Sequence, residues 1–181
     1  MFMGDVFISA NILVVIDMQN DFITGSLGSK DAILILPKII NKVKNYNVGN
    51  IYVTMDTHDS DYLNTLEGKK LPVVHCIKET KGWNIPTELY NYIRNSNIIE
   101  KPSFASFDLC EKLFLRSQME NIEIEIVGVC TDICVISNAL LLKSKMPNTK
   151  ISVDSSCCAG TSLDAHSYAI KIMKTCLMDI L

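Results

Sequence analysis

The sequence predicts an α/β domain in which helices cover both faces of a mainly parallel β-sheet. Short runs rich in β-branched residues alternate along the chain with longer segments whose apolar residues recur every three or four positions. This alternation is typical of proteins in which a helix connects each strand to the next parallel strand. The strand-like runs are mostly apolar, which indicates burial on both faces of the sheet. The expected architecture is therefore a three-layer α/β/α arrangement in one domain of residues 1–181.

Five β-branched runs are expected to form strands: residues 11–17, 50–56, 97–100, 123–129 and 150–154. Five segments with helical spacing are expected to form helices: residues 35–46, 85–95, 107–118, 133–145 and 162–177. The last of these begins with Ser162-Leu163-Asp164, a turn suited to a helix N-cap. Residues 57–83 follow neither period and are too many for a simple connection, so a functional loop is expected there.

Composition and charge exclude several classes of protein. The 181 residues are 48% apolar and 20% charged, which is ordinary for a globular domain and unlike a disordered chain. A net charge of −3 gives no basic surface for nucleic acid. No apolar run approaches the roughly 18 residues of a membrane span. We therefore expect neither nucleic-acid binding nor a membrane span.

The N-terminus and the cysteines predict the compartment. The first ten residues, MFMGDVFISA, lack a basic segment followed by a long apolar one, so no secretory signal is expected. Seven cysteines, an odd number, show no spacing typical of a disulfide framework. Both observations favour a reducing cytoplasm.

Polar and nucleophilic residues follow four of the expected strands. In parallel sheets, ligands bind in the crevice beyond the carboxyl ends of the strands. Asp17 ends the first strand, Asp56 and His58 follow the second, Lys101 follows the third, and the fourth leads into the segment from Cys130 to Cys134. The sequence therefore predicts that these side chains meet at one rim of the sheet.

Cys134 is the candidate nucleophile. The pair Cys130 and Cys134 is spaced C-x-x-x-C, which differs from the C-x-x-C of thioredoxin-like redox sites. If a helix begins near Asp132, its first turn would hold Cys134, favour a thiolate, lower the thiol pKa and offer N–H groups to an oxyanion. The alternative is a small buried cysteine, which is the commoner case for a cysteine taken alone.

Asp17 and Lys101 are the candidate partners of this thiol. Asp17 follows an apolar strand, where burial would raise its pKa and suit it to accept the thiol proton. The ammonium of Lys101 would stabilise a thiolate and developing negative charge. Each residue has an ordinary alternative: Asp17 as the cap of the next turn, and Lys101 as a solvated surface lysine.

A second cluster could hold a metal ion. Asp56 and His58 are two apart on an extended strand end, so their side chains point to the same side. Glu67 and His75 follow in the long loop. Two imidazoles with one or two carboxylates suit Zn²⁺, Mn²⁺ or Fe²⁺. The alternative is a capped turn with two exposed histidines.

The remaining polar residues have simpler interpretations. Asp132 is expected to cap the helix that follows it. His166 is expected on an exposed helical face. Packing in helical or loop settings accounts for Cys110, Cys157, Cys158 and Cys176. Neither a G-x-S-x-G elbow nor a phosphate-binding glycine motif is present.

Five ordered motifs resemble the isochorismatase-like cysteine hydrolases, and within them the nicotinamidase branch. The motifs are IDMQNDF around Asp17, DTH at 56–58, LPVVHC at 71–76, KPSFASF after Lys101, and GVCTDICV at 128–135. The resemblance extends over about residues 11–175, nearly the whole chain.

The resemblance implies a catalytic triad of Asp17, Lys101 and Cys134. It also implies a cis peptide bond between Val129 and Cys130 and an oxyanion hole formed by the backbone N–H groups of Cys130 and Cys134. In the nicotinamidase branch, a metal at the positions of Asp56, His58 and His75 holds the ring nitrogen of the substrate, and Glu67 stands where some members supply a further ligand. Family members are often dimers or tetramers, so a homo-oligomer is expected.

The resemblance also indicates a substrate pocket with departures from the family pattern. Phe22 matches the family's pocket phenylalanine. The segment before His75 lacks the aromatic residue that stacks on the pyridine in many nicotinamidases, and Trp83 is a candidate to replace it. Ile133 stands where several nicotinamidases carry histidine. The expected pocket residues are Phe22, Trp83, Val129 and Ile133.

The function that follows is metal-assisted hydrolysis of nicotinamide to nicotinate and ammonia through a thioester on Cys134, a step of NAD salvage. One alternative is a related cysteine hydrolase with another small amide or ureido substrate, which the missing aromatic residue favours. Isochorismatase-type members cleave a vinyl ether and lack the cysteine, so Cys134 argues against that activity. A non-catalytic binding or assembly protein is disfavoured because Asp17, Lys101 and Cys134 are all present.

Overall fold

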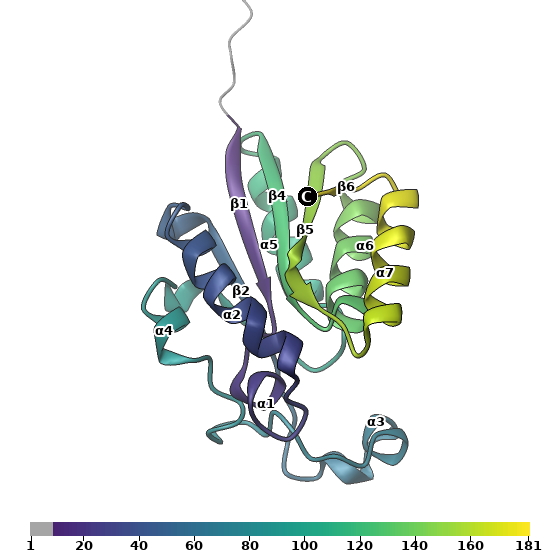
Figure 1. Cartoon of the computed structure of the whole chain (residues 1–181). Coiled ribbons are helices and arrows are strands. Elements are labelled where there is room, and N and C mark those ends of the chain that lie inside the picture. The colour runs from purple at the N-terminus through teal and green to yellow at the C-terminus, as the bar shows by residue number, and fades with distance from the viewer. Residues whose placement is uncertain (1–8) are drawn as a thin grey trace, which may run out of the picture.

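A computed structural model describes residues 9–181 of the chain. In this part of the chain, six parallel strands form one sheet in the order β3-β2-β1-β4-β5-β6 (Figure 1). The strands are β1 Ala10–Ile16, β2 Ile51–Asp56, β3 Ile98–Lys101, β4 Ile122–Val129, β5 Lys150–Ala159 and β6 Asp179–Ile180. The predicted parallel α/β fold is confirmed.

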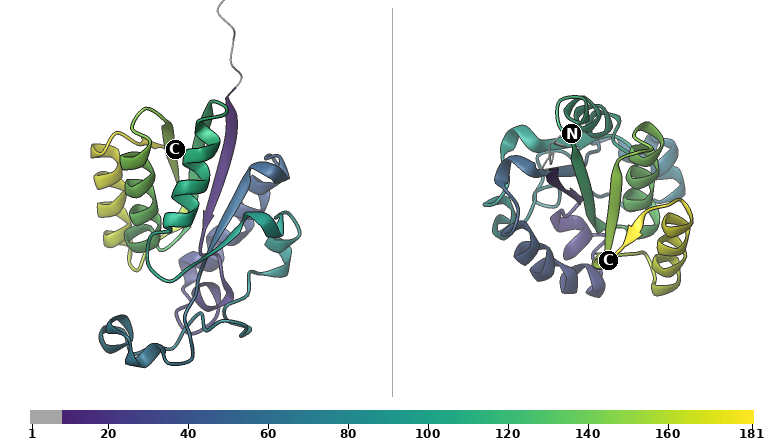
Figure 2. Two further views of the ribbon diagram at one scale, coloured as in Figure 1. Left: turned by 180° about the vertical axis from the view of Figure 1, so that it is seen from behind. Right: turned by 90° about the horizontal axis from the view of Figure 1, so that it is seen from above.

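Helices cover both faces of the sheet (Figures 1 and 2). One face carries α1 Asn20–Ile23, α2 Lys30–Val43 and α4 Thr87–Tyr90, and the other carries α5 Phe107–Ser117, α6 Ile136–Lys145 and α7 Leu163–Thr175. The short helix α3, Leu66–Lys70, lies in the long loop after β2, away from these two layers (Figure 1). A π-helical turn, Thr131–Val135, connects β4 to α6.

Alternate side chains of β1 enter the two cores. Ile12, Val14 and Ile16 pack with α5, α6 and α7, whereas Leu13 and Val15 pack with α2 and α4. All five are fully buried, because β1 lies between β2 and β4 in the middle of the sheet. A strand covered on both faces needs a continuous apolar run, and residues 12–16 supply one.

The strand order reverses between β1 and β4. From β1 the chain passes outward through β2 to β3, and then returns through α5 to form β4 on the other side of β1. The loops leaving β1 and β4 therefore diverge to opposite faces and leave a crevice beyond their carboxyl ends. Asp17 follows β1 directly, and the turn with Cys134 follows β4.

Several element boundaries differ from the sequence-based expectation. Helix α2 begins at Lys30 rather than residue 35, because the Ser29 hydroxyl accepts a hydrogen bond from the Ala32 N–H at 3.0 Å and caps the helix before Pro37. The segment 85–95 contributes only the single turn α4. Strand β5 continues to Ala159, so Cys157 and Cys158 lie in a strand and not in the helical or loop setting expected for them.

Among residues 9–181, no helix has both the length and the apolar character to cross a membrane. The expectation that the chain lacks a secretory signal concerns the first ten residues, and residues 1–8 lie outside the described part.

Candidate active site

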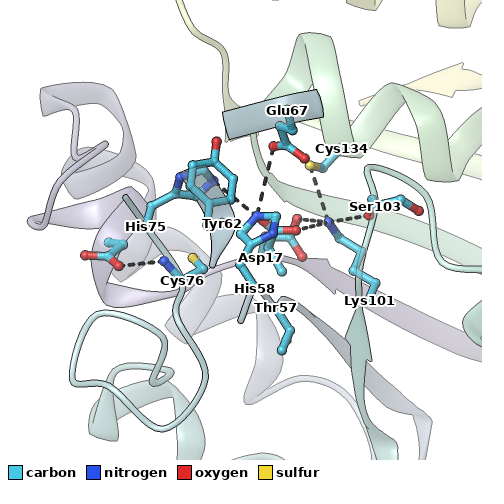
Figure 3. Close-up of polar contacts among 12 residues, drawn as sticks. Asp17, Thr57, His58, Tyr62, Glu67, His75, Cys76, Lys101, Ser103 and Cys134 are labelled. Atoms are coloured by element: carbon cyan, nitrogen blue, oxygen red, sulfur yellow. Dashed lines mark hydrogen bonds and ion pairs between the residues drawn. The ribbon is translucent and has the colours of Figure 1, made fainter. Parts of the chain in front are cut away.

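Three buried polar side chains meet at the crevice between β1 and β4 (Figure 3). Asp17 is the residue after β1, Lys101 is the last residue of β3, and Cys134 lies in the turn after β4. Their exposed fractions are 0%, 1% and 6%. Asp17 has a φ of 50°, in the left-handed region that aspartate tolerates better than most residues. This conformation bends the chain out of β1 at the point where the carboxylate enters the site.

Lys101 lies between the carboxylate and the thiol. Its Nζ is 2.7 Å from Oδ2 of Asp17 and 3.5 Å from Sγ of Cys134. It also donates to the carbonyl oxygen of Ser103 at 3.0 Å. The other carboxylate oxygen of Asp17, Oδ1, accepts a hydrogen bond from the Thr54 hydroxyl at 2.6 Å. One ammonium therefore contacts the candidate base and the candidate nucleophile together.

Burial and charge set the proton affinities of these groups. Burial raises the pKa of Asp17, and the positive charge of Lys101 only partly offsets this effect. Burial works against the charge of Lys101, but Asp17, Cys134 and Asp56 keep its pKa above the ordinary value. Burial and the negative charge of Asp17 raise the pKa of Cys134 well above the ordinary value. The expectation of a lowered thiol pKa was therefore wrong, because loss of solvent outweighs the turn that holds the cysteine.

Asp56, His58 and His75 form a second cluster beside the first. Oδ2 of Asp56 lies 3.1 Å from Nε2 of His58 and 3.5 Å from Nε2 of His75. One potential ligand atom from each residue lies within 4.8 Å of the other two, and all three side chains are buried. A carboxylate and two imidazoles converging in this way form a donor set that suits a divalent metal ion such as zinc.

The loop after β2 is folded so that both imidazoles face Asp56. His58 and Ile77 form a parallel β-bridge, in which the His58 N–H donates to the Cys76 carbonyl oxygen at 3.0 Å. Nδ1 of His75 lies 2.7 Å from the Val73 carbonyl oxygen. With a proton on Nδ1 donated to that carbonyl, Nε2 can offer its lone pair to a metal in place of its contact with Asp56. The contacts around the ring therefore suit His75 to be a ligand.

Glu67, on α3, approaches this cluster less closely. Its Oε1 faces His58 across the cluster (Figure 3). The distance from Oε1 to Nε2 of His58 is 4.0 Å, and the Glu67 side chain is 27% exposed. It lies outside the compact group that Asp56 forms with the two histidines.

Asp56 belongs to both clusters. Its Oδ2 faces the two histidines, while its Oδ1 lies 3.3 Å from Nζ of Lys101. Burial alone would raise the pKa of Asp56, but hydrogen bonds from His58 and His75 and the charge of Lys101 lower it below the ordinary value. Asp56 therefore remains ionised in its buried position.

A pocket of about 930 Å³ opens onto both clusters. Cys134, Asp56 and His75 reach its wall, and its largely apolar lining includes the predicted Phe22, Val129 and Ile133 together with Leu66 and Phe104. The sequence analysis did not predict Phe104, because it assigned a role in the segment after β3 only to Lys101. An aromatic residue three positions after a strand-end lysine is the signal that was available.

Trp83 does not line this pocket, which corrects its assignment as a pocket residue. Its indole N–H donates to the Thr57 hydroxyl at 2.9 Å, and its ring borders a separate depression with Met55 and Ile85. Trp83 was expected in the pocket because it lies at the end of the long loop, but its hydrogen bond to Thr57 holds the ring away from the site.

The backbone around Cys130 has an unusual conformation. The peptide bond between Val129 and Cys130 is cis, as the resemblance implies. Gly128 has a φ of +124°, and a Cβ there would lie 2.1 Å from the Ile16 carbonyl oxygen, so only glycine fits between β4 and β1. Cys130 lines the pocket, and burial raises its pKa to about 12.

Asp132 and His166 differ from their expected roles. The Asp132 carboxylate does not cap its own turn. It instead accepts hydrogen bonds from the Thr161 N–H at 2.8 Å and the Thr161 hydroxyl at 2.6 Å. His166 is half-buried rather than exposed, and its Nδ1 lies 2.9 Å from the Thr131 hydroxyl.

Two residues that the sequence analysis did not single out hold the backbone of the cluster of Asp56, His58 and His75. Gln19, fully buried, accepts the Asp56 N–H at 2.8 Å and donates to the Asp56 carbonyl oxygen at 2.9 Å. The Asp21 carboxylate accepts the Cys76 N–H at 2.8 Å, directly after His75. Both lie in the IDMQNDF motif, where the polar residues after Asp17 were the available signal.

Comparison with known proteins identifies relatives. The Isochorismatase domain family matches residues 11–181. The nicotinamidase of Schizosaccharomyces pombe is 25% identical over 205 residues, covering 93% of this chain and 91% of that protein. The structure of a nicotinamidase from Bacillus subtilis is 25% identical, with a TM-score of 0.78 over 94% of this chain and 98% of that one. A zinc complex of the Pyrococcus horikoshii pyrazinamidase, 21% identical, shares the fold with a TM-score of 0.77 over the same shares of the two chains.

Proposed function

The chain belongs to the isochorismatase domain family, and on that premise we propose that it hydrolyses nicotinamide, with Cys134 as the nucleophile. Its nicotinamidase relatives indicate an amidohydrolase. The observation that carries the mechanism is the position of Lys101, whose ammonium lies 2.7 Å from the Asp17 carboxylate and 3.5 Å from the Cys134 sulfur. A thiol, a base with a raised pKa and a fixed positive charge are what nucleophilic attack on an amide requires.

In the first half of the reaction, Asp17 accepts the proton of the Cys134 thiol while Lys101 stabilises the thiolate. The raised pKa of Asp17 makes this transfer less unfavourable than it would be for an ordinary aspartate. The sulfur forms a bond to the amide carbonyl carbon, and the carbonyl oxygen becomes an oxyanion. The N–H groups of Cys130 and Cys134 donate to that oxyanion.

In the second half, the carbon–nitrogen bond breaks and ammonia leaves with the proton held by Asp17. The remaining thioester on Cys134 is attacked by water, whose proton passes to Asp17. The carbon–sulfur bond then breaks, the carboxylic acid is released, and the thiol regains its proton. Asp17 thus acts alternately as base and acid, while Lys101 keeps its charge throughout.

Asp56, His58 and His75 would hold a divalent metal ion, with zinc as the first candidate. The support is the chemistry of the donor set, the convergence of both Nε2 atoms on the Asp56 carboxylate and the zinc bound by the related pyrazinamidase. When bound, such an ion supplies a Lewis acid that holds a substrate's ring nitrogen and orients the amide. Glu67, with Oε1 4.0 Å from Nε2 of His58, is the candidate for a further ligand.

A second candidate function is hydrolysis of another small amide or ureido compound by the same residues. The pocket volume of about 930 Å³ and the outlying Leu66 and Leu71 favour a substrate larger than a single pyridine ring. We also propose a reducing cytoplasm, which the seven free cysteines support. A homo-oligomeric enzyme is proposed on the resemblance to the family alone.

The test is ammonia release from nicotinamide by the purified protein, with a chelator and with added Zn²⁺ or Mn²⁺. We expect turnover that disappears with the chelator and returns with the metal. A folded, metal-loaded protein that releases no ammonia from nicotinamide but does so from another amide in a panel would establish the second candidate.

A pair of cysteine variants tests the nucleophile. Cys134→Ala removes the sulfur that bonds to the substrate, so kcat should fall by roughly 10³-fold or more while the thermal midpoint changes little. Cys130→Ala keeps the backbone N–H proposed for the oxyanion hole, so its kcat should stay within about threefold of the unsubstituted enzyme. A folded but inactive Cys130→Ala enzyme would contradict the backbone role of Cys130.

A further inference from the structure

The turn that carries Cys134 is tied to the start of α7 by hydrogen bonds from two consecutive residues. Thr131 and Asp132 lie between Cys130 and Cys134, the two residues whose N–H groups are proposed to bind the oxyanion. Their partners, His166 and Thr161, lie on α7 and on the loop before it. The four side chains join the turn after β4 to the segment after β5.

The first link is between Thr131 and His166. Thr131 is fully buried, and its hydroxyl lies 2.9 Å from Nδ1 of His166. A buried hydroxyl without a partner is costly, so this contact fixes the position of Thr131.

The second link joins Asp132 to Thr161. One carboxylate oxygen accepts the Thr161 N–H at 2.8 Å and the other accepts its hydroxyl at 2.6 Å. Gly160 allows this approach, because a Cβ there would lie 2.8 Å from the Asp132 carboxylate and 2.9 Å from Cβ of His166. Both links therefore meet at one tightly packed point.

Inside the turn, one carbonyl oxygen accepts hydrogen bonds from two N–H groups. The N–H groups of Ile133 and Val135 both donate to the Cys130 carbonyl oxygen at 3.1 Å. The orientation of the peptide unit after Cys130 therefore sets the direction of the following amides, including that of Cys134. Thr131 and Asp132 are the side chains that hold this peptide from outside the turn.

We propose that Thr131 and Asp132 are positioning residues, whose hydrogen bonds to His166 and Thr161 aim the N–H groups of Cys130 and Cys134 at one substrate oxygen. The inference rests on the proposed function, since it assumes that these N–H groups stabilise an oxyanion. Donors displaced by about 1 Å lose much of that stabilisation, while the thiol and its base are unaffected.

The experiment compares two reactions of Cys134 that differ in their need for an oxyanion hole. With 4-nitrophenyl acetate, the sulfur bonds to the carbonyl carbon, an oxyanion forms, and 4-nitrophenolate leaves as the ester bond breaks. With iodoacetamide, the sulfur displaces iodide and no oxyanion forms. In both reactions the thiol proton passes to Asp17. The nitrophenolate burst measures the first rate, and mass spectrometry of the Cys134 peptide measures both.

Two matched pairs of variants test the two links. Thr131→Val removes the hydroxyl at nearly constant volume and should slow acylation by roughly 10- to 100-fold, with alkylation within about threefold. Thr131→Ser keeps the hydroxyl and should restore most of the rate. Asp132→Leu and Asp132→Asn should differ in the same way, because asparagine can still accept the Thr161 N–H. Thr175→Val, which removes an exposed hydroxyl at the far end of α7, is the control and should change neither rate.

If Thr131→Val does not fold, His166→Leu and His166→Asn carry the test, since His166 is half-buried and asparagine places a polar atom near the Nδ1 position. The inference is overturned if acylation is unchanged, or if acylation and alkylation fall by the same factor. Ammonia release from nicotinamide by the unsubstituted protein is measured separately. If the variants slow acylation but not alkylation and the unsubstituted protein does not hydrolyse nicotinamide, the positioning role is supported and only the substrate is rejected. If nicotinamide is hydrolysed but the variants do not slow acylation selectively, only the positioning role is rejected.

Discussion

Asp17 is the residue whose proton affinity decides the pH range of the proposed reaction. It can accept the thiol proton only when it is itself unprotonated. Burial raises its pKa above the ordinary 3.8, and Lys101 opposes the shift without cancelling it. The acid limb of kcat/KM should therefore lie above pH 3.8, with activity lost as the pH falls through the raised pKa of Asp17. A pH profile measured with saturating metal checks this, and an acid limb at or below pH 3.8 would count against Asp17 as the base.

Gln19 should control metal affinity without touching the metal. Its side chain bonds both the N–H and the carbonyl of Asp56, so Gln19→Met should free the Asp56 backbone at nearly constant side-chain volume. Loss of a residue that orients a ligand typically weakens metal binding by about 10- to 100-fold. Calorimetric titration with Zn²⁺ measures the change. Asn20→Ala, which loses an exposed hydrogen bond to Lys81, is the control and should bind zinc as the unsubstituted protein does.

The sequence predicted which residues would approach the crevice better than it predicted their environments. Asp17, Lys101 and Cys134 come together because parallel strands end at one edge of a sheet, a rule that needs no coordinates. The direction of the thiol pKa was wrong because it depends on burial, which local sequence does not give. Trp83 was misjudged because side-chain direction in a loop can depend on a single hydrogen bond, here the one to Thr57.

At the level of the elements, the strands with apolar runs were predicted to within one or two residues of their starts. The extension of β5 through residues 155–159 was not, because Ser-Ser-Cys-Cys-Ala has no alternation and forms a strand only by pairing with β4 beyond an irregularity in register. The two-residue β6 was missed because it is too short to carry a period. Helix α4 was predicted too long, since its apolar spacing continues through a turn.

An ion-pair network anchors α2 to the sheet. Lys42 pairs with Glu125 of β4 and, at 2.7 Å, with Asp154 of β5, while the Tyr46 hydroxyl donates to Glu125 at 2.7 Å. Lys42→Met keeps the apolar stem and leaves two carboxylates without their cation. We expect the free energy of unfolding to fall by about 1–2 kcal/mol, because the network is partly solvated. Urea denaturation near neutral pH measures this difference.

The free energies of unfolding of the unsubstituted protein and Lys42→Met should become more similar at acid pH. Burial would raise the pKa of Asp154, but Lys42 and Ser156 lower it below the ordinary 3.8. A carboxylate with a depressed pKa contributes stability above its unfolded value and loses that contribution as the pH falls through its folded value. The stability gap between the unsubstituted protein and Lys42→Met should therefore narrow as the pH falls below 3.8 through the lowered pKa of Asp154. A gap that stays constant in acid would show that Lys42 stabilises the fold through packing alone.

At the level of the whole molecule, the candidate metal site of Asp56, His58 and His75 joins a strand to a long loop that has little secondary structure of its own. Asp56 ends β2, whereas His75 lies on the long loop of residues 57–83, part of which lines the pocket. A metal that binds only the folded arrangement stabilises it by about 2.7 kcal/mol at 100 times its dissociation constant. For a chain of this size, the thermal midpoint should rise by roughly 5–10 °C with Zn²⁺.

Differential scanning fluorimetry with increasing Zn²⁺ measures this shift, and His58→Ala is the matched variant. The variant should show at most a small rise, because two ligands remain. A rise of equal size in both proteins would mean that zinc binds elsewhere on the surface.

The contact between Asp56 and Lys101 also constrains the order in which this site can change by mutation. A first substitution that removes the Asp56 carboxylate would remove a proposed metal ligand and at the same time leave the buried Lys101 ammonium with one counter-charge fewer. One substitution would then affect both the proposed metal site and the charges around Cys134, the proposed nucleophile. A variant that no longer needs a metal would therefore arise by substituting His58 or His75 first, while Asp56 is kept for its negative charge. Because Asp56 serves both clusters, it is the position that a protein engineer would substitute last.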